Sequence, residues 1–392
     1  MSAAVKGSVS MDRDLRLDFF RGLALFCIFI DHIPGAWLGT FTIQFTGLYD
    51  AAEVFIFISG YTAGLVYGRI LETQGTLIMT LRVFHRVWQL YVAHVFLFVI
   101  FMALIGNMTD PTLNPIYTEE FRATDFLKDP GTTIVMALTL RFQPAFMDIL
   151  PLYIVLLTML PLFLIGLQRW KWLILAASLA LWFAVQIHKG VAIPTYPDAG
   201  TKWFFNPFAW QLLFLVGAAL GRARVMGADA ALSNKWLFAA AVALALAGFV
   251  VRLNWTLHLF YDPIPFPFAK YFWFSLSKTN MSPLRLVNVL AAILVVATLV
   301  PRQTRFLVNR ASWPLIVCGR HSLHIFCLGI LLSAIGHWVI NEYYAGFLLQ
   351  TAVVIVGIAI MTAVAAFMDW YPGGRSERKK SLPQTSTTGG AS

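Results

Sequence analysis

Charged side chains are scarce in this chain of 392 residues. Only 12% of the residues are Asp, Glu, Lys or Arg, whereas a soluble domain carries about 25%. Cysteine is scarcer still, and Cys27, Cys318 and Cys327 lie in apolar stretches without the spacing of a metal site. We expect these thiols to pack as small apolar side chains. No internal sequence repeat is evident. The low charge therefore excludes an ordinary soluble domain, and the cysteine pattern excludes a disulfide framework.

Apolar residues make up 59% of the sequence, and they recur in runs of about 20, the length that crosses a bilayer. The pattern predicts an all-α, polytopic membrane bundle of about ten transmembrane helices. The expected helices cover residues 19–38, 48–70, 82–106, 146–167, 171–188, 206–223, 235–252, 284–300, 314–338 and 343–368. Residues 19–370 should form one membrane domain, between a cytoplasmic tail (1–18) and a disordered cytoplasmic tail (371–392) with little apolar surface to bury.

Basic residues determine the predicted orientation. The net charge is +10, and most Lys and Arg side chains lie in the short segments that are cytoplasmic if the N-terminus is inside. The positive-inside rule therefore places both termini in the cytoplasm, and we expect a multi-pass protein of the bacterial inner membrane. The polar N-terminal segment does not resemble a cleavable signal peptide. Because the basic residues act as topology signals, the charge does not indicate nucleic acid as a partner.

The first apolar stretch, RGLALFCIFIDH, carries Arg21 and His32. Ionisable groups at membrane depth are functional candidates, because each needs a partner or a water-filled cavity. A spacing of eleven residues turns a helix through about three full turns, so both side chains should project from one face, roughly 16 Å apart. This arrangement suits an anionic reagent near one membrane surface and proton transfer deeper in the membrane.

Other polar side chains are expected to lie near His32: Glu53, Arg320 and His321 at similar depths, and Asp148, Asn206 and Gln211 near the outer mouth. Glu53 on the second helix is the expected partner that orients the His32 ring and raises its basicity. Candidates for binding the acyl group or its acceptor are Asp148, Asn206, Gln211, Arg320 and His321. For His94 and His324, packing against a carbonyl of a neighbouring helix is the alternative interpretation, and Glu53 could instead neutralise an arginine. No metal site is predicted.

Four arginines at the predicted cytoplasmic face form a second group. Arg82 and Arg86 lie one turn apart before the third helix, and Arg302 and Arg305 follow the eighth. They are either ordinary positive-inside residues or a cradle for a phosphorylated ligand, since guanidinium groups match phosphate oxygens.

The predicted outer loops at 195–210 and 254–274 are rich in aromatic residues and proline. Aromatic rings beside Asp and Asn commonly hold sugars. The alternative is the aromatic belt that marks a membrane interface.

These motifs have a counterpart in a known superfamily. The Arg21–His32 spacing resembles the first-helix signature of the membrane acyltransferase-3 superfamily, and Phe57, Ser59 and Gly60 match its F-x-S-G motif. The Arg82 and Arg86 pair matches its basic stretch before the third helix. Blocks at 147–157, 206–217 and 319–333 narrow the resemblance to the OpgC family, which succinylates osmoregulated periplasmic glucans.

The resemblance implies an inner-membrane O-acyltransferase. It would take an acyl group from a cytoplasmic donor, succinyl-CoA, and deliver it to a sugar hydroxyl of a periplasmic glucan. His32 and Arg21 carry over as the paired functional residues of the superfamily, with His32 as general base. Glu53 is added from its position alone. Acyl-CoA is then a co-substrate, and no tightly bound cofactor is expected.

Further partners and rival functions remain open at this point. Expected partners are the bilayer, the glucan and possible glucan-synthesis proteins. Direct transfer is preferred over a covalent acyl-histidine relay, because no Ser or Cys shares the His32 face in an obvious nucleophile setting. A proton-coupled secondary transporter would also explain buried His, Glu and Arg, although the duplicated halves of many transporters are missing. A membrane scaffold with purely structural polar groups is the third interpretation.

Overall fold

The protein is described by a computed structural model. It describes residues 14–112, 115–188, 190–197, 201–227, 234–257, 276–302 and 304–371. Apart from their inner ends, the two predicted tails lie outside the described residues, as does most of the aromatic loop at 254–274. The described residues form helices and no β-strand, which confirms the all-α prediction.

Eleven of the helices are longer than eight residues or take part in the sites below. They are α1 (Leu15–Asp31), α2 (Ala51–Thr112), α5 (Pro130–Leu138), α6 (Ile149–Arg169), α7 (Lys171–Ile187), α8 (Pro207–Val225), α9 (Lys235–Leu257), α11 (Pro283–Leu299), α12 (Trp313–Arg320), α13 (Ser322–Glu342) and α14 (Phe347–Trp370). Short helices α3 (Ile116–Glu120) and α4 (Thr124–Lys128) follow α2, and the 3-10 turns η1 (Trp37–Phe41), η2 (Ile43–Thr46), η4 (Arg305–Val308) and η5 (Arg310–Ser312) complete the described elements.

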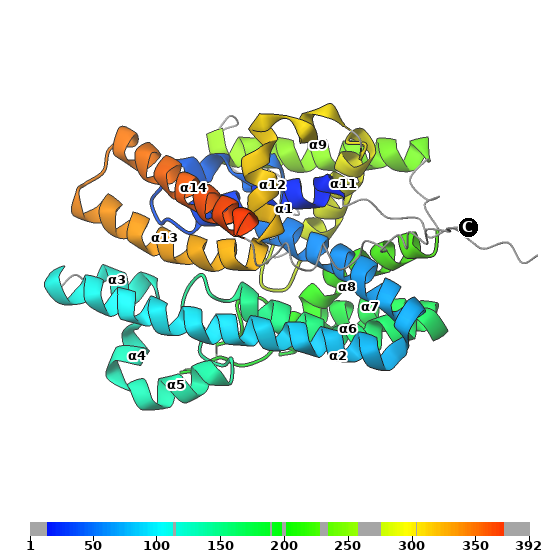
Figure 1. Ribbon diagram of the computed structural model, residues 1–392, viewed down its shortest axis with the longest axis horizontal. Helices are drawn as coiled ribbons and strands as arrows, with labels where there is room; N and C mark the ends of the chain where they lie inside the picture. The colour runs from blue at the N-terminus through cyan, green and yellow to red at the C-terminus, as the bar shows by residue number, and fades with distance from the viewer. Residues whose placement is uncertain are drawn as a thin grey trace, which may run out of the picture.

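Six of the described helices are long and apolar enough to cross a membrane, as expected for a membrane protein. They are α2, α6, α8, α9, α13 and α14, and the shorter α7 and α11 are also apolar. Most of the long helices run roughly along the long axis of the molecule (Figure 1). The exposed side chains of α9 and α14 are largely apolar, which suits contact with lipid tails. The count of ten spans stays a prediction.

Helix α2 is 62 residues long and is interrupted at one residue, Gly75, whose φ is +84°. A glycine adopts this backbone conformation without steric cost, so the chain turns there and α2 forms two arms (Figure 1). The two arms correspond to the expected helices at 48–70 and 82–106. The prediction of a loop between them is wrong, because the helix continues on both sides of the single glycine.

Two other expected helices differ from the structure. Helix α1 ends at Asp31, so His32 is its C-terminal cap and is not inside a helix at 19–38. Pro34 and Gly35 explain the early end, because proline disfavours helix in the residue before it and Gly35 has φ of +79°. The expected helix at 314–338 is divided at His321 into α12 and α13.

Glycines bring several helices into close contact. A Cβ atom at Gly60 or Gly64 of α2 would collide with backbone carbonyl oxygens of α8, and Gly217 and Gly221 of α8 face α2 in the same way. Small residues at four-residue spacing are the usual means of packing membrane helices backbone to backbone. With Gly60 and Gly64 turned toward α8, Thr62 is free to face α1 and bond Arg21.

Helices α1 and α12 pack equally closely and run antiparallel. Gly22 lies against the Leu315 carbonyl, and Gly319 lies against the Asp18 carbonyl. We call the end of the bundle where α1 begins the basal end, and the end where α1 finishes the apical end. Arg16 marks the basal end by donating a 2.8 Å hydrogen bond to the carbonyl of Val300, just beyond α11.

Candidate active site

Arg21 lines a narrow cavity between α1, both arms of α2, α6 and α13. Its guanidinium donates a 2.7 Å hydrogen bond to the Thr62 hydroxyl. The cavity holds about 170 Å³, and we call it the arginine cavity. Its lining side chains are Arg21, Phe55, Ser59, Thr62, Ala63, Val66, Tyr67, Arg86, Leu90, Ile149, Leu150, Tyr153, Ser322, Leu323 and Phe326. From Phe55 to Tyr67 the lining follows α2 for about 18 Å, so the cavity is elongated.

Of the four arginines expected to bind an acyl donor, Arg86 joins Arg21 in this cavity. Arg86 is half-buried and donates to the Gln89 side-chain amide at 3.0 Å, so its charge has a neutral partner. Arg82 is exposed and does not line the cavity. Arg302 is ion-paired with Asp14 at 3.3 Å.

Arg305 is likewise exposed, on η4 at the basal end of the bundle. The structure therefore brings one of the four, Arg86, to the side of Arg21.

His32 caps α1 at the apical end. Its ring stacks on Phe146, with centroids 4.5 Å apart and a 34° tilt. Nδ1 is buried, and neither ring nitrogen bonds another of the described residues. His32 does not line the arginine cavity, so the structure does not place both groups in one passage. The ring is held by packing, and Nε2 is the nitrogen that is not fully buried.

Glu53 does not bond His32, so that interpretation is wrong. Its carboxylate is fully buried and accepts hydrogen bonds from the Arg285 guanidinium, one of them 2.7 Å long at Nε. It also accepts from the backbone N–H of Asp50 at 3.0 Å. The alternative in which Glu53 neutralises an arginine is the one that the structure supports. The physical reason is the position of Arg285. It lies in the first turn of α11, which is next to the start of α2, where Glu53 lies.

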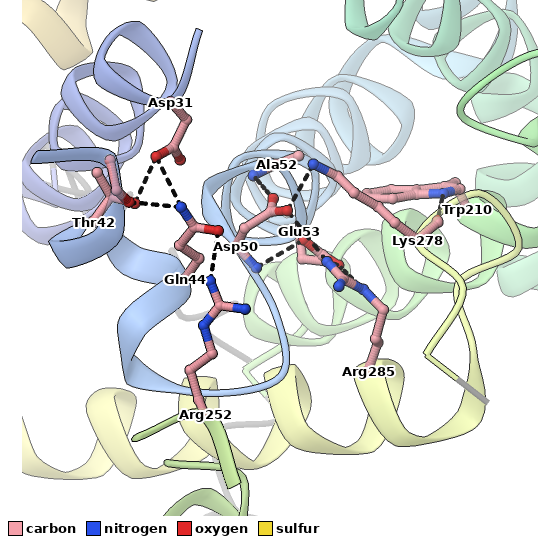
Figure 2. A network of polar contacts seen from close by, with 11 residues as sticks. Asp31, Thr42, Gln44, Asp50, Ala52, Glu53, Trp210, Arg252, Lys278 and Arg285 are labelled. Atoms are coloured by element: carbon pink, nitrogen blue, oxygen red, sulfur yellow. Dashed lines mark hydrogen bonds and ion pairs between the residues drawn. The ribbon is translucent and has the colours of Figure 1, made fainter. Parts of the chain in front are cut away.

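Asp50 extends this pair into a network of four charges at the apical end (Figure 2). Its carboxylate is 2.6 Å from the Lys278 ammonium and 3.3 Å from Arg285. Burial opposes ionisation of Asp50, but Lys278 and Arg285 more than offset it and hold the pKa of Asp50 well below its usual range. Burial likewise disfavours the charged Lys278, yet Asp50 and Glu53 raise its pKa. We call Asp50, Glu53, Lys278 and Arg285 the apical charge network.

A second chain of polar contacts runs beside it from α1 to α9 (Figure 2). The Asp31 carboxylate accepts from the Thr42 hydroxyl at 2.7 Å and from the Gln44 amide at 3.3 Å. The carbonyl oxygen of that Gln44 amide accepts from Arg252 at 2.8 Å. Gln44 therefore links Arg252 on α9 to the residue that directly precedes His32.

Two of the expected acceptor-binding residues have structural hydrogen bonds. Asn206 caps α8 by accepting from the N–H of Phe208 at 3.1 Å, and it donates to the Val191 carbonyl at 2.8 Å. Gln211 accepts from the Ser178 hydroxyl and donates 2.9 Å to the Ser178 carbonyl. Both amides are buried, so their contacts hold helices together.

Asp148 precedes α6 and is also buried, and its carboxylate bonds no other described residue. It sits directly before Ile149 and Leu150, which line the arginine cavity. Asp148 is therefore the member of this group that is still free for a ligand.

Arg320 and His321 do not lie beside His32, contrary to our expectation. They bond the two carboxylate oxygens of Asp369, each at 2.9 Å, near the end of α14. Gly319 packs on Asp18, so this group lies near the start of α1, at the basal end. The physical reason is the close packing of Gly319 on α1, which fixes the end of α12 beside the start of that helix.

The remaining histidines divide into exposed and buried ones. His324 is exposed on α13. His94 is buried, and neither of its nitrogens bonds a described residue, so the expected carbonyl bond is not present. The described residues contain no cluster of three or more His, Cys, Asp or Glu side chains that could hold a metal ion.

Sequence reasoning missed a support for the His32 segment. His337 on α13 lies 3.3 Å from the Pro34 carbonyl through Nδ1 and 3.1 Å from Glu120 through Nε2. The Phe121 ring contacts both His337 and Phe146, the residue that stacks on His32. Three residues of the apical charge network were also missed, Asp50, Lys278 and Arg285, although charges next to the expected ends of apolar helices were a visible signal.

Comparison with known proteins gives a family but no individual relative. No curated protein matches the chain, and no solved structure matches it. A family model described as OpgC protein matches residues 13–373, nearly the whole chain. The match includes the helices around the arginine cavity, the Arg21–His32 segment and the apical charge network. The chain therefore belongs to the OpgC protein family, and an OpgC-type acyltransferase is the role that this membership suggests.

Proposed function

We propose that the protein is a membrane O-acyltransferase that moves a succinyl or similar short acyl group from acyl-CoA to a hydroxyl of periplasmic glucan. The donor enters at the basal end, which faces the cytoplasm, and the acceptor is modified at the apical end. The observation that carries the proposal is the arginine cavity, in which Arg21 and Arg86 share a narrow lining that extends along α2.

The donor has an anionic head and a long, thin arm. Guanidinium groups bind phosphate oxygens through paired, charge-assisted hydrogen bonds, which suits Arg21 and Arg86 as its anchor. The lining between Tyr67 and Phe55 is about 18 Å long and mostly apolar. It suits a pantetheine arm whose thioester points to the apical end. Three other arginines do not line this cavity and serve at most as a route of entry for the anion: Arg82, Arg302 and Arg305.

His32 acts as general base at the apical end. Its imidazole takes the proton from a glucan hydroxyl while the oxygen attacks the thioester carbonyl carbon. The carbon–sulfur bond then breaks, and the proton on His32 passes to the departing thiolate, so the products are an ester and free CoA. Its Nε2 has no bond to a described residue and, unlike Nδ1, is not fully buried, which leaves this nitrogen able to accept the proton. Glu53 belongs to the charge network and acts only by positioning.

The test compares two helix-capping histidines. His32→Ala should lower transfer of radiolabelled succinyl from succinyl-CoA to glucan by about 10²–10⁴-fold, the usual loss of a general base. His188→Ala is the matched control, because His188 is exposed and caps the end of α7. Both variants should reach the membrane in normal amounts. Label that moves across the membrane as unmodified solute, with none on glucan, would instead identify a transporter.

Transfer that persists in His32→Ala at the wild-type rate would contradict the proposed base. Mass spectrometry of periplasmic glucan from cells with and without the protein supplies an independent readout. The expected result is a mass gain of one acyl unit per modified hydroxyl, which identifies the acyl group and the acceptor together.

A further inference from the structure

A second, larger cavity opens at the apical end and has no role in the steps above. It holds about 700 Å³, within the range of about 300–1,000 Å³ that is typical of ligand sites. We call it the apical cavity. The side chains of its wall that carry the argument are Gln44, Tyr49, Gln186, Arg252, Trp255 and Asn280.

The chemistry of this wall is that of a site for a neutral, polyhydroxylated ligand. Amide groups of Gln44, Gln186 and Asn280 offer both donors and acceptors. Tyr49 and Trp255 offer ring faces on which the C–H faces of a sugar can stack. An anion fits less well, because the Asp50 carboxylate is part of the same wall and the charge of Arg285 is already taken up by Glu53.

Arg252 has a donor that the protein does not use. One terminal nitrogen donates to Gln44 at 2.8 Å, but its Nε is buried without a hydrogen-bond partner among the described residues. A buried donor without an acceptor is costly, by about 1–3 kcal/mol. The other terminal nitrogen of Arg252 also bonds no described residue, and it is the donor from which a ligand hydroxyl or ring oxygen in the cavity would accept, without introducing a charge.

The wall of the cavity also contacts the segment that precedes His32. Gln44, on this wall, donates to Asp31, the residue before His32. A ligand held by Arg252 and Gln44 is therefore positioned against the segment that carries the proposed base.

We propose that the apical cavity binds a neutral segment of the glucan acceptor, with Trp255 as a stacking surface and Arg252 and Gln44 as its polar contacts. The inference rests on the proposed function in that the bound glucan is the acyl acceptor. It moves the acceptor site away from Asn206 and Gln211, whose amides are engaged within the protein.

The experiment uses the full-length protein in lipid nanodiscs, succinyl-CoA as donor, and unacylated glucan isolated from cells that lack the protein. Trp255→Ala and Arg252→Gln are each expected to raise the KM for glucan about tenfold or more, the effect of losing a charge-assisted hydrogen bond or a comparable contact. The KM for succinyl-CoA should stay unchanged. Trp255→Phe, which keeps an aromatic ring, should recover part of the loss.

Matched controls lie at the other end of the same helix. Trp236→Ala and Lys235→Gln remove an exposed tryptophan and a positive charge at the basal end of α9, and neither should change the KM for glucan. Retained succinyl-CoA binding identifies folded variants. Arg252→Gln still tests the cavity where Trp255→Ala fails to fold.

The outcomes separate the inference from the function on which it rests. If the wild-type protein transfers no acyl group to glucan, the proposed function fails. If it transfers the group and both Arg252→Gln and Trp255→Ala leave the KM for glucan at its wild-type value, the apical cavity is not the acceptor site. Tight binding of inorganic phosphate that disappears in Arg252→Gln would overturn the proposal in favour of an anion site.

Discussion

The apical charge network and the arginine cavity use arginine in opposite ways. At the apical end, Arg285 contacts Glu53 and Asp50, and Lys278 contacts Asp50, so cations and anions are balanced within the network. In the arginine cavity, Arg86 donates to the neutral amide of Gln89. This hydrogen bond therefore does not neutralise the positive charge of Arg86.

The difference separates charges that organise the protein from charges that can serve a ligand. A buried cation that is paired with carboxylates joins helices, because removing either partner leaves an unpaired buried charge. A half-buried arginine bound to a neutral group keeps donors for a ligand, as Arg86 does in the arginine cavity and Arg252 does in the apical cavity. Four predictions test this distinction.

The largest effect is expected in the apical charge network. Glu53→Ala leaves Arg285 with Asp50 as its remaining carboxylate and should lower the free energy of unfolding by about 3–5 kcal/mol, the usual cost of breaking a buried ion pair. Thermal unfolding of the purified protein in detergent measures the loss. The double variant Glu53→Ala with Arg285→Ala should be less destabilised than the sum of the two single variants. Additive losses would mean that the pair is not coupled.

The second effect is expected in binding. Arg86→Ala should raise the KM for succinyl-CoA about tenfold to a hundredfold, as expected for loss of a charge-assisted contact to phosphate. Stability should change little, since Arg86 bonds only a neutral amide among the described residues. Arg82→Ala is the control, because Arg82 lies four residues earlier on the same helix and does not line the cavity. Equal effects of the two substitutions on the KM would argue against a specific donor site.

The contrast between the two sites also marks what the sequence could predict. The length of the apolar runs predicted the helical class and the start of most helices, because hydrophobicity is a local property of the chain. The Arg21 and Arg86 pairing followed from a motif. The partner of Glu53 could not be predicted from a motif, because Arg285 is 232 residues away and only tertiary packing brings it close. The ends of α1 and α12 were missed because apolar residues continue past the points at which the backbone turns.

The third prediction concerns pH and the Asp50–Lys278 pair. The folded state lowers the pKa of Asp50, so its contribution to stability is complete above the unfolded pKa of about 4 and is lost as the pH falls further. The folded state raises the pKa of Lys278, so that contribution is complete below about pH 10 and is lost as the pH rises further. The difference in melting temperature between wild type and Asp50→Asn should therefore be constant from about pH 5 to 9 and shrink below about pH 4. A difference that already changes between pH 5 and 8 would show that another group controls it.

The smallest effect is expected at the basal group of Arg320, His321 and Asp369. Arg320 and Asp369 are about one-third exposed, at 33% and 35%, so solvent screens their ion pair. Arg320→Ala should therefore cost at most about 1 kcal/mol of stability, the range of surface ion pairs. It should leave the KM for glucan unchanged, because the group lies beside the start of α1, whereas the apical cavity lies beyond its end. Asp369→Asn removes the same pair from the other side and should behave alike. The contrary result is a KM for glucan that rises in Arg320→Ala and not in Asp369→Asn. It would place Arg320 in the acceptor site, and acceptor binding would then not be confined to the apical end.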